Sequence, residues 1–255
     1  MPELSGKVAL VTGASQGIGR ATALRLARGG ADVAGNYRSH PDEAEDVARA
    51  IRASGGRAIT VAADLADPAQ ILDMAARVQR DLGTVSIVVN NAAVFPWRAW
   101  DEVTLETWEN VFDVNVRAAW LTAKAFAPGM QAEGWGRIIS MASATFLTGS
   151  SHLAHYAASK GALIGLTRSL ARALGDDGIT VNAVSTGKTL TEGFEQYFEE
   201  GVLDREETLQ SRRDQAIKRI GAPEDVVGAI AFLASDEASY LTGQLINVDG
   251  GRSMY

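Results

Sequence analysis

The sequence alternates between two hydrophobic patterns from one end to the other. Short apolar runs such as "KVALVT" (7–12) and "VSIVVN" (85–90) are typical of strands that are buried on both faces. Segments with the helical period of about 3.6 residues fill the intervals between them. Strand, helix and strand repeated in this way predict an α/β fold, a doubly wound parallel seven-stranded sheet flanked by helices.

The boundaries of these elements follow from the same two patterns. The predicted strands cover 7–12, 31–37, 57–64, 85–90, 136–143, 179–185 and 244–250. Clear helical patterns cover 17–28, 42–53, 68–82 and 223–234. No linker, internal repeat or low-complexity tract divides the chain, so we expect a single domain over 1–255.

The longest stretch without a strand signal runs from about 188 to 219. It contains "TEGFEQYFEEGVLDREE", which is acidic, aromatic and helical in pattern. A long insertion in a compact fold is more often functional than decorative, so we expect a substrate lid at about 188–219. A solvated amphipathic helix pair is the alternative.

Composition excludes several classes of function. The chain has no cysteine, and its three histidines lack metal-ligand spacing, which argues against disulfides and against a metal site. A net charge of −7 argues against nucleic acid as a partner. We expect no membrane contact either, because no apolar run approaches the ~20 residues of a span and no signal peptide is present. The sequence therefore predicts a soluble, cytoplasmic protein.

A glycine-rich turn follows the first predicted strand. In "TGASQGIGRATALRLA", Gly13, Gly17 and Gly19 precede or open a helix. Glycine permits positive φ and close approach of a pyrophosphate, and the N–H groups at a helix N-terminus attract that anion. The position favours a dinucleotide site over a plain strand-to-helix turn.

Tyr156 and Lys160 are four residues apart in the helical pattern "HYAASKGALIGLTRSLARAL", so they share one face. A free tyrosine has a pKa near ~10, and a neighbouring ammonium would lower it toward a useful acid and base. A surface Tyr–Lys pair is the alternative.

Several motifs occur in a fixed order along the chain. They are the spacing Thr-Gly-x-x-x-Gly-x-Gly from Thr12, then "NNAA" (90–93), "VNV" (114–116), Ser143, "YAASK" (156–160) and the terminal "DGG" (249–251). In this combination the chain resembles the short-chain dehydrogenase/reductase family over essentially all 255 residues. The resemblance implies a Rossmann-like domain and an NAD(P)-dependent oxidoreductase, either a short-chain alcohol dehydrogenase or a carbonyl reductase.

The resemblance also implies a catalytic tetrad of Asn115, Ser143, Tyr156 and Lys160. Tyr156 would exchange a proton with the substrate oxygen while Ser143 hydrogen-bonds that oxygen. Asn115 would bend its helix and hold a water in a proton relay. The alternative is a nucleotide-binding module that has the fold but no catalytic activity. Turnover of a substrate by the wild-type protein would rule it out.

The end of the second strand bears on the choice of cofactor. Family members that use NAD carry an acidic residue at the position of Tyr37. Here Arg38 and Ser39 follow instead, a pair suited to the 2′-phosphate of NADP(H). Gln16 is neutral where many NADP-using relatives are basic, so NAD(H) or dual use stays open, as does a merely solvated Arg38.

The resemblance places further cofactor contacts along the carboxyl ends of the strands, with Asp64 at adenine and Thr191 at the nicotinamide carboxamide. The full predicted cofactor set is Gly13, Ser15, Gln16, Gly17, Ile18, Gly19, Tyr37, Arg38, Ser39, Asp64, Leu65, Asn91, Ala92, Ala93, Tyr156, Lys160, Gly187, Thr189 and Thr191. Two residues depart from the family pattern: Ala93 replaces a glycine and Thr186 replaces a proline. Ala93 is tolerated only with an ordinary backbone angle.

The predicted substrate wall is aromatic with little positive charge, which indicates a small secondary alcohol or ketone, with cyclic and aromatic compounds as candidates. It comprises Phe95, Trp97, Ser143, Thr145, Phe146, Tyr156, Phe194, Tyr197 and Phe198. Reduction of a 3-oxoacyl group on acyl carrier protein is the alternative. Its acidic partner would need a basic patch, which Arg98, Arg117 and Arg137 could form, although the acidic lid argues against it.

The patterns "VRAAWLTAKAFAPGM" and "YAASKGALIGLTRSLARAL" carry more small and apolar surface than a monomer would expose. We therefore expect a homo-oligomer, and the resemblance implies a tetramer or a dimer.

Overall fold

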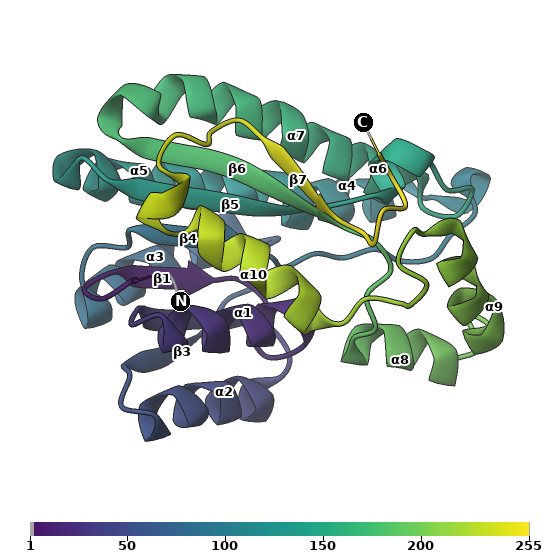
Figure 1. The fold of residues 1–255 in the computed structure, drawn as a ribbon, viewed down its shortest axis with the longest axis horizontal. Coiled ribbons are helices and arrows are strands. Elements are labelled where there is room, and N and C mark those ends of the chain that lie inside the picture. The colour runs from purple at the N-terminus through teal and green to yellow at the C-terminus, as the bar shows by residue number, and fades with distance from the viewer. Residues whose placement is uncertain (1–2, 255) are drawn as a thin grey trace.

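A computed structural model describes residues 3–254. Its seven strands form one parallel sheet in the order β3-β2-β1-β4-β5-β6-β7 (Figure 1), as the alternating sequence pattern predicts. The strands are β1 (Val8–Val11), β2 (Asp32–Tyr37), β3 (Ala58–Ala62), β4 (Ile87–Asn90), β5 (Gly136–Ser143), β6 (Ile179–Thr186) and β7 (Leu245–Val248).

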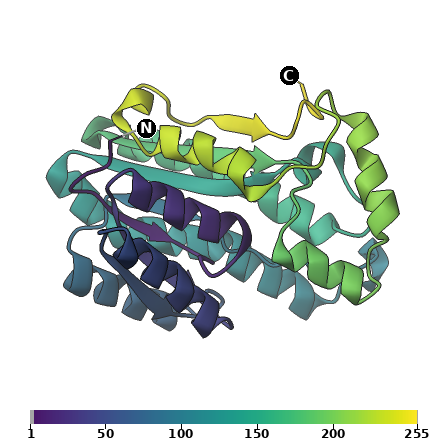
Figure 2. The same ribbon diagram turned by 60° about the horizontal axis from the view of Figure 1, so that its bottom comes forward.

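Helices cover both faces of this sheet, which makes three layers (Figures 1 and 2). One face carries α1 (Gly17–Arg28), α2 (Pro41–Ala53) and α10 (Pro223–Leu233). The other carries α3 (Pro68–Leu82), α5 (Ala118–Glu133) and α7 (Ala154–Leu174). Four shorter helices, α4 (Leu105–Phe112), α6 (Thr145–Thr148), α8 (Glu192–Glu199) and α9 (Arg205–Gln210), complete the set.

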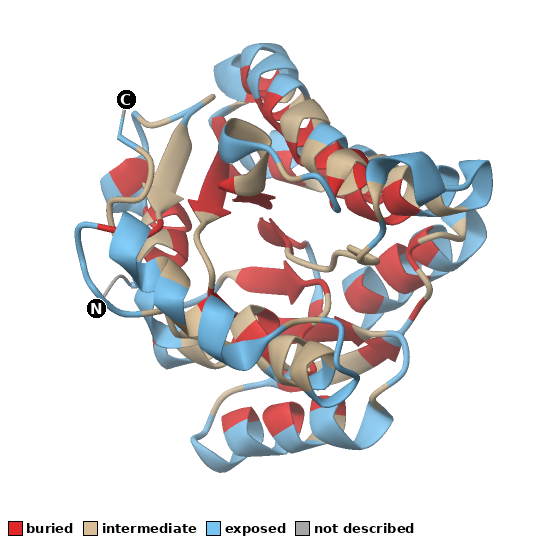
Figure 3. Cartoon of the chain, turned by 90° about the vertical axis from the view of Figure 1, so that its right-hand side faces the viewer, coloured by how far each residue is buried: buried red, intermediate tan, exposed pale blue. Residues whose placement is uncertain are grey.

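The central strands are buried along their whole length. Every residue of β1, β4 and β5 is buried, and the two apolar clusters on either side of the sheet contain most of the core. In Figure 3 the strands lie between helices whose outer faces are exposed. Because side chains on both faces are apolar, polar groups collect where the strands end.

The predicted boundaries agree with the structure to within a few residues. Helices α1 and α3 have the predicted limits, and α2 begins one residue early, at Pro41. The last strand ends at Val248 instead of at residue 250. The reason is Asp249, whose carboxylate accepts hydrogen bonds from the N–H groups of Gly251, Arg252 and Ser253 and so turns the chain.

The segment 188–219 contains two helices, α8 and α9, in agreement with its helical pattern. Its first part is anchored by a parallel bridge between Thr189 and Gly221. Its last part contacts the C-terminal turn, where the Ile217 N–H donates to the Gly250 carbonyl over 2.8 Å. The segment therefore begins and ends beside the carboxyl ends of β6 and β7.

One buried amide holds the glycine turn against the sheet. Asn36 of β2 is 2% exposed. Its Nδ2 donates to the carbonyls of Val61 and Ala63, and its Oδ1 accepts from the Gly13 N–H over 3.3 Å. Asn36 thus joins the end of β3 to the turn that follows β1.

We predict that Asn36→Ala lowers the free energy of unfolding by about 3 kcal/mol, because several buried backbone groups lose their partner. Chemical denaturation monitored by circular dichroism measures this change. Asn110→Ala, at an exposed position, is the matched control and should stay within about 0.5 kcal/mol of the wild type. Equal midpoints for the two variants would contradict the role given to Asn36.

Candidate active site

A cleft of about 1220 Å³ opens at the carboxyl ends of the strands. It runs from the end of β2, through the glycine turn and the segment after β4, to Ser143, α7 and the segment 188–219. Ligands of open parallel sheets bind at this edge, so the cleft is the candidate site.

The glycine turn forms one end of the cleft. Gly13 and Gly17 have φ angles of 63° and 54°, which other residues rarely adopt. At Gly19 a Cβ atom would lie 2.0 Å from the carbonyl oxygen of Gly13, so no side chain fits there. Gly19 packs behind the turn and does not line the cleft.

An anion already contacts this turn. The Gly17 N–H, at the start of α1, donates to Oε2 of Glu192 over 2.9 Å. Arg20 lies 3.9 Å from the other oxygen of the same carboxylate. Because α1 has no acidic residue in its own first turn, Glu192 of α8 supplies the negative charge that this helix end favours. The residues of the turn therefore suit a phosphate.

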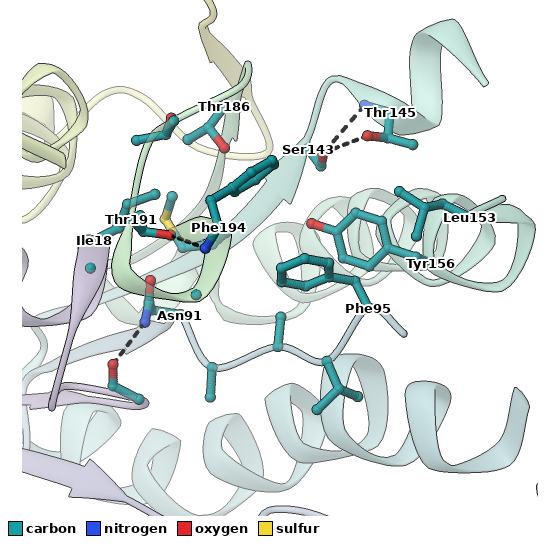
Figure 4. A pocket seen from close by; sticks show the side chains of 18 of the residues that line it. Ile18, Asn91, Phe95, Ser143, Thr145, Leu153, Tyr156, Thr186, Thr191 and Phe194 are labelled. Atoms are coloured by element: carbon teal, nitrogen blue, oxygen red, sulfur yellow. Dashed lines mark hydrogen bonds between the residues drawn. The ribbon is translucent and has the colours of Figure 1, made fainter. Parts of the chain in front are cut away.

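Ser143, Tyr156 and Lys160 all line the opposite wall, and Figure 4 shows the first two. Ser143 ends β5, and its Oγ donates to Thr145 Oγ1 over 3.0 Å. Figure 4 shows the Tyr156 hydroxyl pointing into the space between Ser143 and Phe194. Lys160 Nζ lies 5.4 Å from the centre of the Tyr156 ring and donates to the Met141 carbonyl over 2.6 Å.

Asn115 lies behind this wall and does not line the cleft. It is the centre of a π-helical turn, Asp113–Arg117, which interrupts the regular α-helix between α4 and α5 at the residue where a bend is expected. Its amide is bonded to both backbone groups of Val94 and to Ser159 Oγ. Asn115 therefore joins the segment after β4 to α7.

Burial dominates the electrostatics of the Tyr–Lys pair. Withdrawal from water raises the pKa of Tyr156 to about 12, and a hydrogen bond with Ser143 offsets only part of this rise. Burial also lowers the pKa of Lys160 to about 7. In the protein alone the pKa of Tyr156 is therefore raised and not lowered, and Lys160 is itself only partly charged at neutral pH.

Aromatic side chains form the wall beside Tyr156. Phe95 lies 5.6 Å from Tyr156, 6.4 Å from Phe194 and 5.5 Å from Tyr197, measured between ring centres. The Tyr197 hydroxyl donates to the Phe95 carbonyl over 3.1 Å, so α8 is attached to the segment after β4. The buried His155 Nε2–H donates to the Pro96 carbonyl over 3.0 Å and fixes the same segment from α7.

The far end of the cleft lies beside β2. Tyr37, Arg38, Ser39, Asp64 and Leu65 line it. Arg38 is exposed, and its guanidinium has no hydrogen bond or ion pair within residues 3–254. Ser39 Oγ lies 3.0 Å from His40 Nδ1. The guanidinium of Arg38, with its N–H donors free, thus faces solvent at this end of the cleft.

Comparisons with known proteins agree with this geometry. A family model described as enoyl-(acyl carrier protein) reductase matches residues 13–253. The chain is 39% identical to an L-rhamnose 1-dehydrogenase (NAD(P)(+)) from a Sphingomonas species, over 98% of both chains. It is 38% identical to a 3-oxoacyl-[acyl-carrier-protein] reductase from a Synechocystis species, over the full length of both.

A solved structure from Beutenbergia cavernae has the same fold. That protein, described as a candidate NAD(P)-dependent gluconate 5-dehydrogenase, carries NADP at low occupancy. It superposes with a TM-score of 0.90 at 40% identity, over 98% of both chains. The chain belongs to the short-chain dehydrogenase/reductase family.

Most of the predicted site residues of this dehydrogenase/reductase do line the cleft. Of the predicted cofactor residues, only Gly19 does not line the cleft. The φ angle of Ala93 is not positive, so its methyl group is tolerated. Two predicted substrate residues lie elsewhere. Phe146 packs toward Ala142, Ile164 and Ala183, and Phe198 faces Arg205.

The cleft is more cationic than the predicted substrate wall. Lys188 and Arg252 line it, although neither belongs to the predicted set. Both occupy loops that follow strands, where hydrophobic periodicity gives no signal. Their positions after β6 and β7 are the only hint in the sequence, because the carboxyl ends of parallel strands meet at one edge.

No helix of the described part of the chain is both long and apolar enough to cross a membrane.

The pKa of Lys160 leads to a prediction on stability. In the unfolded chain this amine binds a proton up to its ordinary pKa of 10.5, whereas in the folded protein it loses the proton near pH 7. The unfolded state therefore binds more protons between these values, and stability rises with pH. We predict that the free energy of unfolding, relative to Lys160→Met, increases by about 2 kcal/mol from pH 7 to pH 9.

Urea denaturation of the two proteins without cofactor, at several pH values, measures this difference. Lys218→Met, at an exposed position, is the control and should show no such slope. A difference between wild type and Lys160→Met that does not change with pH would contradict the lowered pKa.

Proposed function

We propose that this enzyme transfers hydride between NADP(H) and a small secondary alcohol or ketone. The observation that carries the proposal is the meeting of Ser143, Tyr156 and Lys160 on one wall of a cleft whose other parts are the glycine turn and Arg38. The NADP bound to the Beutenbergia cavernae protein and the NAD(P)(+) use of the Sphingomonas enzyme support the choice of cofactor.

The glycine turn would hold the pyrophosphate, and Arg38 with Ser39 the 2′-phosphate. When bound, the nicotinamide supplies or accepts the hydride. Thr189 and Thr191 lie on the segment that would face its carboxamide.

The chain's own residues would handle the proton. Ser143 Oγ–H would hydrogen-bond the substrate oxygen, where negative charge develops. A phenol with a pKa of about 12 keeps its proton at neutral pH, so Tyr156 is ready to donate it to a carbonyl oxygen. When Lys160 Nζ gains a proton, its positive charge would lie close to the phenol of Tyr156. Asn115 and Ser159 would keep the helix and the segment after β4 in register.

Reduction of a 3-oxoacyl group on acyl carrier protein is less well supported. The Synechocystis relative has that activity, but the basic patch it would need is incomplete here. Arg137 is 2% exposed and bonded to the Ser235 carbonyl. Arg117 is paired with Asp113 and bonded to the Ala66 carbonyl, which leaves Arg98 alone.

Assembly into a dimer or tetramer belongs to the same proposal. Trp108 of α4 and Trp120 of α5 are exposed, and α7 lies against α5. Large apolar side chains on neighbouring helices favour contact with another copy of the chain.

We predict that Tyr156→Phe lowers turnover at least about a hundredfold, because the proton donor is lost while the ring remains. NADPH oxidation with a panel of small cyclic and aromatic ketones measures this loss. The Kd for NADPH should stay within about threefold, which shows that the cleft is intact. Wild-type protein that turns over no alcohol or carbonyl compound with either cofactor would sink the proposed activity and favour a binding module.

We predict that NADPH binds at least about tenfold more tightly than NADH, and that Arg38→Ala removes this margin. Fluorescence titration of each nucleotide measures the two dissociation constants. Arg28→Ala, in the last turn of α1 and outside the cleft, is the control. Equal binding of the two nucleotides by the wild type would show that Arg38 does not select the phosphate.

A further inference from the structure

Four lysine and arginine side chains line the cleft within residues 3–254: Arg38, Lys160, Lys188 and Arg252. The proposed function uses the first two, at the β2 end and beside Tyr156. Lys188 and Arg252 have no role in it. Both are partly buried, so their charges are not fully exposed to water.

The strand register places the loops that carry these two cations on the same edge of the sheet as Ser143. Thr186 of β6 is the register partner of Ser143, and Lys188 follows it by two residues. Val248 of β7 is in turn the partner of Thr186, and Arg252 follows it by four residues. The loop that carries Lys188 therefore follows the strand beside the one that Ser143 ends, about 4.8 Å away, and the loop that carries Arg252 follows the next strand beyond it.

The backbone that presents the two side chains is fixed. The Lys188 carbonyl accepts from the Gly221 N–H over 3.1 Å, and Thr189 forms the bridge to the same residue. On the other side, the Arg252 N–H is one of the three held by the Asp249 carboxylate. The two loops touch, because a Cβ atom on Gly187 would lie 3.0 Å from Asp249 Cβ.

Within the described residues, no carboxylate lies within ion-pair distance of either cation. Neither side chain forms an ion pair or a hydrogen bond there. Glu207 and Asp214 act on Lys188 only from a distance beyond ion-pair contact, and Glu200 also lines the cleft. Burial and the repulsion of Arg252 both lower the pKa of Lys188. A bound anion would relieve this repulsion.

We propose that Lys188 and Arg252 form a carboxylate-binding subsite, and that the substrate of this enzyme is a short hydroxy acid or oxo acid. The inference rests on the proposed function, which it narrows to one chemical class. An arginine fork and an ammonium together suit a carboxylate. The aromatic wall formed by Phe95, Phe194 and Tyr197 would then contact the apolar part of the molecule.

A phosphate of the cofactor is the other source of the same negative charge. Arg38 stands at the opposite end of the cleft and the glycine turn has its own N–H donors, so the cofactor's phosphates already have partners in the proposed function. The test therefore measures cofactor and carboxylate separately.

Binding of unreactive probes tests the subsite without turnover. Butanoate, pentanoate and hexanoate, each beside its uncharged amide, are titrated into the protein–NADPH complex by calorimetry. We expect at least one acid to bind about tenfold more tightly than its amide. Lys188→Met and Arg252→Met should each remove most of this preference, and the exposed Lys218→Met should keep it.

The Kd for NADPH, measured for the same variants, should change by less than about threefold. A loss of NADPH affinity equal to the loss of acid binding would assign the pair to a cofactor phosphate and overturn the inference. So would acids and amides that bind the wild type alike. If acids bind as expected but neither oxo acids nor neutral ketones are reduced, the proposed function fails while the subsite stands.

Discussion

Burial of the central strands on both faces is the constraint on which the rest of the structure depends. Because helices cover both sides of β1, β4 and β5, polar groups gain access to solvent and ligands mainly where these strands end. Because the neighbouring strands are all parallel, those ends lie at the same edge of the sheet. Residues from Gly13 to Arg252 therefore line one cleft, although almost the whole chain separates them.

The same burial sets the chemistry of the catalytic wall. Tyr156 and Lys160 lie on a helix packed against β5 and β6, and burial there disfavours their charged forms. The pKa of Tyr156 is therefore raised and that of Lys160 is lowered. The Met141 carbonyl gives the amine its one protein partner. Near pH 7 the amine of Lys160 gains and loses its proton readily, whereas Tyr156, with a pKa of about 12, keeps its proton in the protein alone.

The parts of the fold and of the site that could be predicted from the sequence are those that depend on short-range sequence patterns. Hydrophobic periodicity identified the strands and the larger helices, and the motifs along them located the glycine turn and the Tyr–Lys pair. Phe146 and Phe198 were misplaced because, in short helices, one step around the axis decides between core and cleft. Arg137 was expected at the surface, but it lies in β5 and is bonded to the backbone around it. The pKa of Tyr156 depends on burial by distant segments, which no local pattern records.

The contact between Glu192 and Gly17 joins two parts of the molecule that are 175 residues apart in the chain. One N–H group cannot serve two anions equally well, so a phosphate that enters the turn competes with the carboxylate that begins α8. Such competition is reciprocal: whatever loosens α8 frees the turn, and whatever fills the turn releases the first residue of α8. Anion binding at the glycine turn and the position of the first residue of α8 are thus coupled through the hydrogen bond between Gly17 and Glu192.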